Sequence, residues 1–418
     1  MEVTDVQYKE SEIGVIPVDW NVKKISDFSK PVRGGSPRPA GSPLYFNGDY
    51  IPWLTVAALT NISSSQLFVS ETEGFLTQLG SEYSRTLEKD TLIIANSGAT
   101  LGVAKLLAIK CCANDGIAAL NNFSREVDKA YVVYYINSIT QKLREVVATG
   151  NGQPNLNTTL IGELRIPLPS TKSEQTAIAT ALSDTDALIE NLEKLIAKKR
   201  NIKQGVMQEL LTGKKRLAGF KGKWVTIKIG EVADIHKGNG LSKTKLKQAG
   251  KYGCILYGEL FTTYKRIIKN AISHTDYEEG VYSKAGDILM PGSTTTTGID
   301  LAIASAVLKD NILLGGDINV IRPKTASINS IFLAYYITEV LKHKILELTQ
   351  GITIIHLYGK DLKTLEIAIP EISEQDAIGK ILVDIDEELS GLENQMNKYQ
   401  LIKQGMMQKL LTGKIRLV

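Results

Sequence analysis

The stretch Ile202-Lys203-Gln204-Gly205 returns 200 residues later as Ile402-Lys403-Gln404-Gly405, and this repetition decides the fold. Two further pairs share the offset: Ser173-Glu174-Gln175 with Ser373-Glu374-Gln375, and Leu210-Leu211-Thr212-Gly213-Lys214 with Leu410-Leu411-Thr412-Gly413-Lys414. Aligned without a gap over residues 173–217, the two copies match at 24 of 45 positions. Solenoid repeats run only about 20–50 residues, so this period indicates two tandem halves.

The repeat weakens outside these segments but does not vanish. Trp20 and Trp224 begin similar stretches, and Tyr134-Tyr135-Ile136 answers Tyr335-Tyr336-Ile337. Between these anchors the halves diverge. An ordinary duplicated domain is one interpretation. Halves that differ in their globular parts and match in one segment instead favour two different ligands and one common partner.

The repeated segments are expected to be long helices. Residues 173–211 contain no proline and one glycine, and their apolar residues recur at steps of three and four. Ser173 is a plausible N-cap, and Gly213 and Gly413 fit the C-terminal ends. A helix of about 37 residues would span roughly 55 Å.

Both helices have an apolar face to bury, and the simplest solution is that they pack on each other as an antiparallel coiled coil. The contact between the helices is interrupted by polar residues at Thr185, Lys199, Glu388 and Gln395. A second interpretation is therefore a helix pair that also binds another subunit through one face. The third is that the apolar residues only pack in a core. The residues predicted to pack in the helix pair are Ile178, Leu182, Leu192, Ile202, Ile378, Leu382, Leu392 and Ile402.

The globular parts are predicted to be α+β. Short β-like runs stand at 50–54 and 91–95 in the first half and at 287–290 and 318–321 in the second, with one helix each near 129–147 and 328–348. We therefore expect four segments: a first globular domain (1–170), a first long helix with its flanks (171–217), a second globular domain (218–371) and a second long helix with its flanks (372–418).

Basic loops containing glycine follow the first segment of both halves, and hydroxyl-rich stretches follow at 96–100 and 292–297. Arginine, lysine and small polar residues can contact phosphates and base edges, although solvated turns are an equally good interpretation of any one of them. The candidate nucleic-acid contacts are Lys30, Arg33, Arg38, Ser97, Thr100, Lys237, Asn239, Lys243, Lys245, Ser293 and Thr294.

Composition narrows the remaining possibilities. The net charge of +4 fits nucleic-acid binding without proving it. The three cysteines form no C-x-x-C pair, the four histidines are scattered, and no phosphate-loop, nucleophile-elbow or zinc-protease motif occurs, so we expect neither a metal site nor catalysis. Gly150-Asn151-Gly152-Gln153-Pro154-Asn155 starts like a dinucleotide motif and ends with the wrong residue. No export signal or membrane-length apolar run is present, and we expect a cytoplasmic protein.

An ordered set of motifs resembles the specificity subunits of type I restriction-modification systems over essentially the full length. The first half shows Ile16-Pro17-Val18-Asp19-Trp20, Gly48-Asp49-Tyr50-Ile51-Pro52-Trp53 and Gly152-Gln153-Pro154-Asn155-Leu156. Ile166-Pro167-Leu168-Pro169 with Ser173-Glu174-Gln175 resembles the junction into the spacer helix, and Tyr257-Gly258-Glu259-Leu260 is also similar to the family. Gln350-Gly351-Ile352-Thr353 departs from the Gln-Pro-Asn form, which puts residue-by-residue transfer in the second half in doubt.

The resemblance implies a DNA-reading subunit that does no chemistry itself. Each recognition domain would read one half of a bipartite duplex target, and the two helices would fix the gap and dock two methyltransferase subunits. Restriction subunits would join that core. S-adenosylmethionine, ATP and Mg²⁺ are expected on those partners and none on this chain. The alternatives are a specificity subunit of a related multi-subunit system, an adaptor that binds only proteins, and an enzyme with an unrecognised active site.

Overall fold

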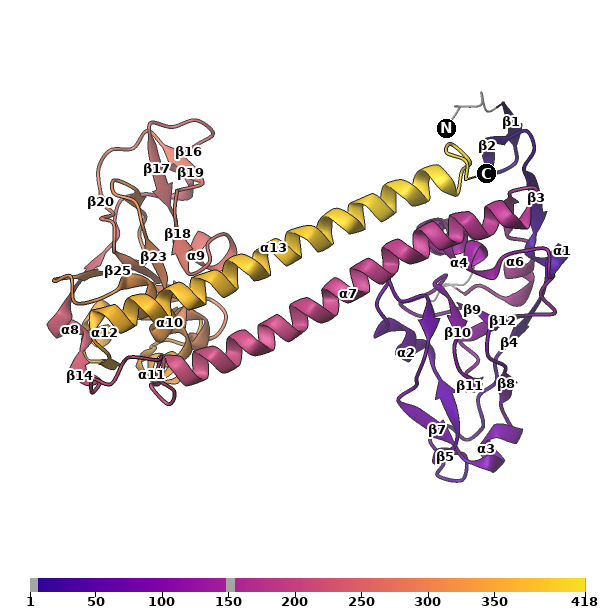
Figure 1. Ribbon diagram of the computed structural model, residues 1–418, viewed down its shortest axis with the longest axis horizontal. Coiled ribbons are helices and arrows are strands. Elements are labelled where there is room, and N and C mark those ends of the chain that lie inside the picture. Colours follow the sequence, from indigo (N-terminus) through magenta and orange to yellow (C-terminus); the bar gives the residue numbers. More distant parts are fainter. Residues whose placement is uncertain (1–6, 148–154, 418) are drawn as a thin grey trace. The chain divides into compact units, whose positions relative to one another are not determined.

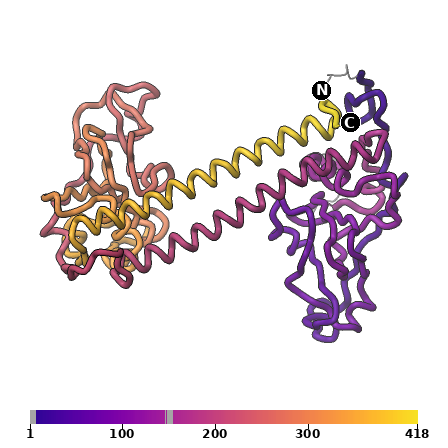
Figure 2. Tube along the Cα trace, in the orientation of Figure 1, coloured from indigo at the N-terminus to yellow at the C-terminus, as the bar shows by residue number. Residues whose placement is uncertain are grey.

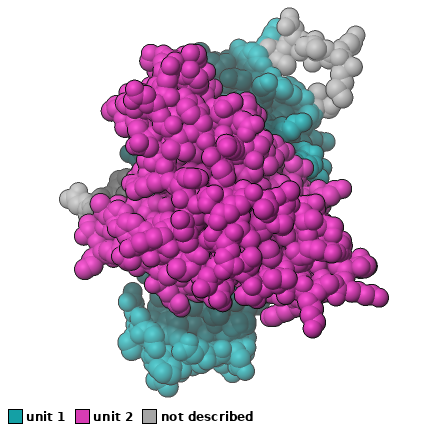
Figure 3. Space-filling model, turned by 90° about the vertical axis from the view of Figure 1, so that its left-hand side faces the viewer, with its two compact units in different colours: residues 1–195, 392–418 teal, residues 196–391 magenta. Residues whose placement is uncertain are grey.

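The computed structural model describes residues 7–147 and 155–417, so part of the Gly152–Leu156 motif lies outside the described residues. The chain divides into two compact units (Figure 3). Unit 1 comprises residues 1–195 and 392–418, and unit 2 comprises residues 196–391. The boundary falls inside both long helices, whereas the sequence-based segments ended where the helices end. Each unit therefore contains a mixed α+β globular part and a piece of each helix.

The two long helices match in length and bounds. They are α7 (Lys172–Leu210) and α13 (Ile372–Leu410), each of 39 residues, and each can be followed as an unbroken coil in Figure 2. The Thr171 hydroxyl accepts a hydrogen bond from the Glu174 N–H at 3.3 Å. Thr171 therefore caps α7 in place of the predicted Ser173, because the helix begins at Lys172, two residues earlier than a cap at Ser173 implies.

Gly213 and Gly413 follow the helix ends with positive φ of 68° and 70°. A Cβ atom on Gly413 would lie 2.3 Å from Pro17, and one on Gly213 would lie 3.2 Å from the ring of Trp224. Glycine is therefore required at both positions by backbone conformation and by close packing.

Unit 1 is built on two sheets, of order β4-β12-β9-β10-β6 and β7-β5-β11-β8, with the ribbons β13-β3 and β1-β2 beside them (Figure 1). Its strands are β1 (Tyr8–Ser11), β2 (Gly14–Pro17), β3 (Asn21–Lys24), β4 (Lys30–Arg33), β5 (Phe46–Leu54), β6 (Phe68–Val69), β7 (Gly74–Leu76), β8 (Arg85–Leu87), β9 (Leu92–Ala95), β10 (Ala104–Leu107), β11 (Cys111–Ala113), β12 (Ile117–Asn121) and β13 (Arg165–Leu168). Its shorter helices are α1 (Ile25–Phe28), α2 (Val56–Thr60), α3 (Gln78–Glu82), α4 (Lys129–Ser138), α5 (Thr140–Lys142), the π-helix Leu143–Val147 and α6 (Thr158–Gly162).

Unit 2 repeats the first of these sheets as β15-β25-β21-β23-β18, with the same strand directions, and the second as β19-β17-β24-β20, extended by β16. The ribbon β14-β27 repeats β3-β13, and β22-β26 is a further ribbon. Its strands are β14 (Val225–Lys228), β15 (Ala233–Lys237), β16 (Leu246–Lys247), β17 (Tyr252–Ile255), β18 (Ile267–Ile268), β19 (Ser273–Thr275), β20 (Val281–Tyr282), β21 (Ile288–Pro291), β22 (Ser293–Thr294), β23 (Ser305–Val307), β24 (Leu313–Leu314), β25 (Ile318–Pro323), β26 (Ile355–His356) and β27 (Glu366–Ile369). Its helices are α8 (Ile229–Val232), α9 (Glu259–Thr262), α10 (Ser330–Glu339), α11 (Lys342–Leu348), α12 (Gly359–Leu362) and the 3-10 turns Lys243–Lys245 and Gly298–Ala302.

The four predicted strands overlap β5, β9, β21 and β25 to within one residue, while each predicted helix is broken into pieces. The helix near 129–147 becomes α4, α5 and a π-helix, and that near 328–348 becomes α10 and α11. Apolar periodicity did not show these breaks, because Ile136 and Leu143, on either side of the first break, are both buried.

The helices pack antiparallel within each unit. In unit 1, Leu410 joins the core that contains Ile178 and Leu182. In unit 2, Met207 and Leu210 join the core that contains Ile378 and Leu382. The start of one helix thus meets the end of the other in both units, as the coiled-coil expectation requires.

Candidate nucleic-acid interface

A basic residue at the end of the first sheet strand faces an acidic turn in unit 1. Arg33 ends β4, and its Nε donates to the Asp115 carbonyl at 2.7 Å while a terminal nitrogen lies 3.6 Å from the Asp115 carboxylate. Arg38 approaches the same carboxylate at 3.8 Å, and Ser36 donates to it at 2.7 Å. Exposed ion pairs add little stability, so the turn serves to orient the arginines. Both arginines remain more than half exposed and keep donors for a ligand.

Unit 2 carries the same arrangement with different residues. Lys237 ends β15, and its Nζ lies 2.9 Å from Asp317, in the turn before β25. Burial acts to raise the pKa of Asp317, but the Lys237 ammonium and the Ser293 hydroxyl outweigh it and hold that pKa below its usual range. The glycine after each basic residue is fixed by packing: a Cβ on Gly34 or Gly238 would lie 2.1 Å from a backbone oxygen of the opposite turn.

The other candidates from the basic loops, three lysines and Asn239, lie on the surface. Lys30 and Asn239 are exposed at the start of β4 and just after β15, and Lys243 is exposed in a 3-10 turn. Lys245 closes that turn, donates to the Gly240 carbonyl at 3.1 Å and lies 3.2 Å from the ring centre of Tyr277. The ring holds the ammonium over its face by cation–π attraction.

The hydroxyl candidates are less accessible than the sequence suggested. Thr100, Ser293 and Thr294 are buried, and Ser97 is half-buried. Ser293 donates to Asp317 at 3.2 Å, and Thr294 lies 2.8 Å from the Thr296 hydroxyl. Contact of Thr100, Ser293 and Thr294 with a ligand stays a prediction, and in this structure Ser293 and Thr294 bond to neighbouring loop residues.

Sequence reasoning missed Asp115 and Asp317, which hold the basic residues in place. Their local sequences differ, Asn114-Asp115-Gly116 against Gly315-Gly316-Asp317, so the repeat does not reveal them. Arg85 was also missed, and its Nε donates to the Arg33 carbonyl at 2.6 Å. Only the folded turns bring these groups together.

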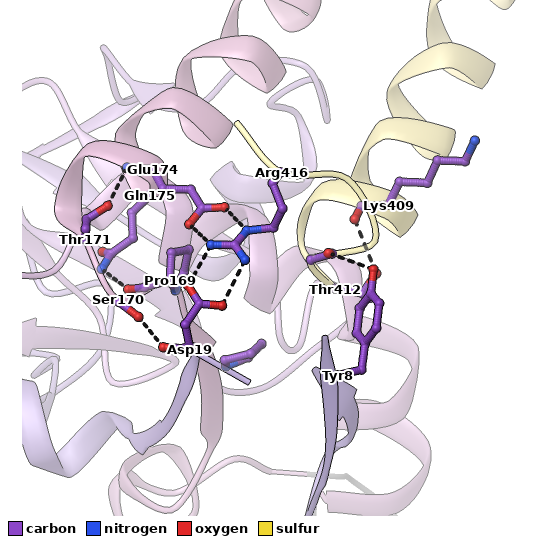
Figure 4. A network of polar contacts seen from close by, with 12 residues as sticks. Tyr8, Asp19, Pro169, Ser170, Thr171, Glu174, Gln175, Lys409, Thr412 and Arg416 are labelled. Carbon is purple, nitrogen blue, oxygen red and sulfur yellow. Dashed lines mark hydrogen bonds and ion pairs between the residues drawn. The ribbon is translucent and has the colours of Figure 1, made fainter. Parts of the chain in front are cut away.

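The helix ends are fastened by an arginine clasp in each unit. In unit 1, Arg416 binds both carboxylate oxygens of buried Glu174 and also Asp19 at 2.8 and 2.9 Å (Figure 4). In unit 2, Arg216 binds Glu374 at 2.6 and 2.5 Å. Arg416 lowers the pKa of Asp19, because the carboxylate accepts its hydrogen bonds.

A second repeated contact lies further along the helix pair. Lys403 on α13 lies 2.5 Å from Asp186 on α7, and Lys203 on α7 lies 2.6 Å from Asp386 on α13. A buried tyrosine donates to each aspartate, Tyr134 at 2.8 Å and Tyr335 at 2.5 Å. Lys199 and Glu388, expected to interrupt the seam, form an ion pair at 2.7 Å.

The predicted packing positions differ in their environment. Ile178, Leu182, Leu192, Ile378 and Leu382 are buried, and Leu392 is half-buried. The prediction is wrong at Ile202 and Ile402, which are 44% and 41% exposed. Lys203 and Lys403 occupy the seam there, and the preceding residue is turned about 100° away around the helix.

Among residues 7–147 and 155–417, no group of three or more histidine, cysteine, aspartate or glutamate side chains is placed to hold a metal ion. In the same residues no helix is both long and apolar enough to cross a membrane.

Two halves of the chain, residues 17–199 and 221–403, match the model of the type I restriction modification DNA specificity domain. The fold and the comparison define a DNA-recognition subunit of a restriction-modification system. The chain belongs to the family of type I restriction-modification specificity subunits, the non-catalytic recognition components of those systems.

Some relatives match nearly the whole chain, and others match about half of it. The type I restriction enzyme MjaVIII specificity subunit of Methanocaldococcus jannaschii is 24% identical over 98% of this chain and 96% of its own length. The MjaIX specificity subunit of the same organism is 32% identical over 46% of this chain and 43% of its own length. The crystal structure of a type I S subunit from M. genitalium matches with a TM-score of 0.63, 16% identity and 98% coverage of both chains.

Proposed function

We propose that the chain reads a bipartite duplex target, with one recognition domain for each half. One observation carries the proposal. At the same place in each unit a basic side chain is held by a carboxylate: Arg33 by Asp115, and Lys237 by Asp317. Equivalent geometry with different residues is what two readers of different half-sites require. Arginine suits a bidentate contact to guanine and lysine a single contact to a base or phosphate.

The two long helices would set the gap between the half-sites, because each is a continuous run of 39 residues that enters both units. Their exposed apolar side chains, among them Leu188, Leu401 and Ile402, offer a surface for methyltransferase subunits. In this proposal the partners carry S-adenosylmethionine, ATP and Mg²⁺, restriction subunits complete the complex, and the assembly works in the cytoplasm.

The test is selection from a random duplex pool by the chain together with its neighbouring methyltransferase subunit. Sequencing should show a split motif with a fixed internal gap. A single contiguous motif, or none, would mean that the duplicated architecture does not serve bipartite recognition.

Helix length gives a sharper test of the spacing role. Seven residues added to both α7 and α13, after Lys194 and after Glu393, lengthen each helix by roughly 10 Å. The gap should grow by about 3 base pairs while both half-sites stay unchanged, since base pairs are stacked about 3.4 Å apart. The matched control is the same insertion in α7 alone, which shifts the helices out of register and should abolish selection. An unchanged gap in the double insertion would remove the spacing role.

A further inference from the structure

A cavity of about 400 Å³ lies inside unit 1, where both long helices meet the globular part. Lys105 and Val103 line it from β10 and the turn before it, Asp186 from α7, Lys403 and Met407 from α13, and Tyr134 from α4. Its volume falls in the range of small-molecule sites, about 300–1,000 Å³. Its walls combine apolar surface with two lysines.

Lys105 is buried, at 3% exposure. Its Nζ donates to the carbonyls of Ser63, at 2.8 Å, and of Gln66. An ammonium has three donors, so one remains for another acceptor. Burial, with repulsion from Lys403, lowers the pKa of Lys105 to about 8 even though Asp186 acts in the opposite direction. A lysine is seldom buried without a carboxylate partner.

The charges that face Lys105 leave one cation unbalanced. Lys403 comes from α13, and Asp186, which it pairs with, comes from α7. Tyr134 from α4 is neutral, because burial holds the pKa of its phenol well above the usual range. Glu193, also on α7, accepts from the hydroxyls of Ser63 and Ser65 at 3.1 and 3.5 Å, and it does not line the cavity.

Unit 2 provides an internal comparison at the same place. Ala104 and Ala304 each donate a backbone N–H to a helix side chain, Asn137 and Thr338, so the next positions, Lys105 and Ser305, are equivalent. The Ser305 hydroxyl donates to the Lys265 carbonyl at 2.6 Å and carries no charge.

Two cations near this place in unit 2 each have a carboxylate. Lys203 pairs with Asp386 at 2.6 Å, and Arg266 lies 3.6 Å from Glu339. The formal charges of those two pairs sum to zero, whereas the charges of Lys105, Lys403 and Asp186 sum to +1. The charge imbalance thus belongs to the unit 1 cavity and not to the repeated design.

We propose that this cavity is a binding site for a small organic carboxylate, whose anionic group would lie between Lys105 and Lys403 and whose apolar part would face Val103 and Met407. Such a ligand would supply the negative charge that unit 2 obtains from Glu339. Because the cavity is lined by β10, α4, α7 and α13, an occupant would tie the globular part of unit 1 to both helices.

The test uses the full chain, sodium butyrate as the probe, and hydrogen exchange read separately over residues 100–107, 183–189 and 400–407. Butyrate should slow exchange there in a saturable way at pH 7, and sodium chloride at equal ionic strength should not. Lys105→Met should weaken the effect at least tenfold, while the matched surface variant Lys89→Met should leave it unchanged. Circular dichroism melting establishes that both variants are folded.

A second measurement needs no variant. Binding to the protonated amine alone predicts that butyrate affinity falls by up to tenfold per pH unit above about pH 8. Protection that never saturates, that chloride reproduces, or that persists in Lys105→Met would overturn the proposal. Binding that is independent of pH between 7 and 9.5 would do the same. If only acidic protein partners protect these residues, the site is a docking contact and the small-ligand proposal is wrong.

Discussion

Arg416 donates from Nε and from a terminal nitrogen to the two carboxylate oxygens of Glu174, at 2.5 and 2.7 Å. Glu174 stands in the first turn of α7 and is almost fully buried, while Arg416 follows the end of α13. Arg216 and Glu374 form the same pair with the helices exchanged. Each unit therefore fastens the end of one long helix to the beginning of the other.

Replacing Arg416 with alanine should destabilise unit 1. The change leaves Glu174 buried without a partner, which costs about 3–5 kcal/mol for a buried ion pair. Hydrogen exchange should rise over the first turns of α7 and around Trp20, over whose ring the guanidinium lies at 5.7 Å. Arg216→Ala is the matched control and should open unit 2 instead. Equal exchange in wild type and Arg416→Ala would show that the clasp adds no stability.

The same variant should change the acid sensitivity of the fold. Arg416 lowers the folded-state pKa of Asp19 below its ordinary 3.8. A carboxyl with a depressed folded pKa contributes stability above its unfolded pKa and loses it as the pH falls through the folded value. The difference in unfolding free energy between wild type and Arg416→Ala should therefore shrink below pH 3.8. Urea titrations at pH 2.5 to 6 measure it, and a difference that grows toward acid would contradict the assignment.

Lys105→Met should change how stability depends on alkaline pH. The folded pKa of Lys105, about 8, lies below the ordinary 10.5, so the unfolded chain binds more protons between these values. Wild-type stability should rise with pH in that window, by at most about 1.4 kcal/mol per pH unit for one proton. Methionine removes this slope. Denaturant unfolding at pH 7.5 to 10.5 measures this dependence. If stability rises equally steeply with pH in the variant, the pKa of Lys105 is not lowered in the folded protein.

The sequence revealed the helices better than the contacts between them. The residues of the two ion pairs are conserved between the copies: Asp186 corresponds to Asp386, and Lys203 corresponds to Lys403. The repeat therefore contained a signal for both pairs. Pairing them requires the antiparallel register, in which α7 and α13 exchange roles between units. Apolar periodicity predicted Ile202 and Ile402 as contacts between the helices. It could not predict Lys203 and Lys403 there, because a charged residue does not count in an apolar pattern.

The sequence located the exposed basic residues of these loops, but it did not separate exposed from buried hydroxyl groups. Arg33 and Lys237 stand at the ends of basic strands and were found from their type and position. Thr294 was chosen for its hydroxyl and proved to be buried. Hydroxyl groups satisfy their hydrogen bonds equally well inside a turn and at its surface, so residue type could not separate the two cases.

Alanine at Arg33 and at Lys237 should affect different halves of the target. If Arg33 reads a base, Arg33→Ala should cost about 1–3 kcal/mol and relax one position of one half-site. If it contacts a phosphate, binding should weaken evenly across sequences and the salt slope should fall by about 1. Lys237→Ala should act on the other half-site alone. Selection with each variant distinguishes these outcomes, and exposed Lys89→Ala serves as the control. Loss at both half-sites from one substitution would argue against independent readers.

Leu401→Glu should separate partner docking from folding. The Leu401 side chain is 69% exposed on α13, so the change should alter the unfolding free energy by no more than about 0.5 kcal/mol. A glutamate there places a charge on the apolar surface proposed for a methyltransferase subunit, and burying that charge without a partner is unfavourable. Titration with the neighbouring methyltransferase subunit should show at least tenfold weaker binding. Gln78→Glu, exposed on α3 in the globular part of unit 1, adds the same charge away from both long helices and should bind normally. Full affinity in Leu401→Glu, with unchanged stability, would place the methyltransferase contact elsewhere on the chain.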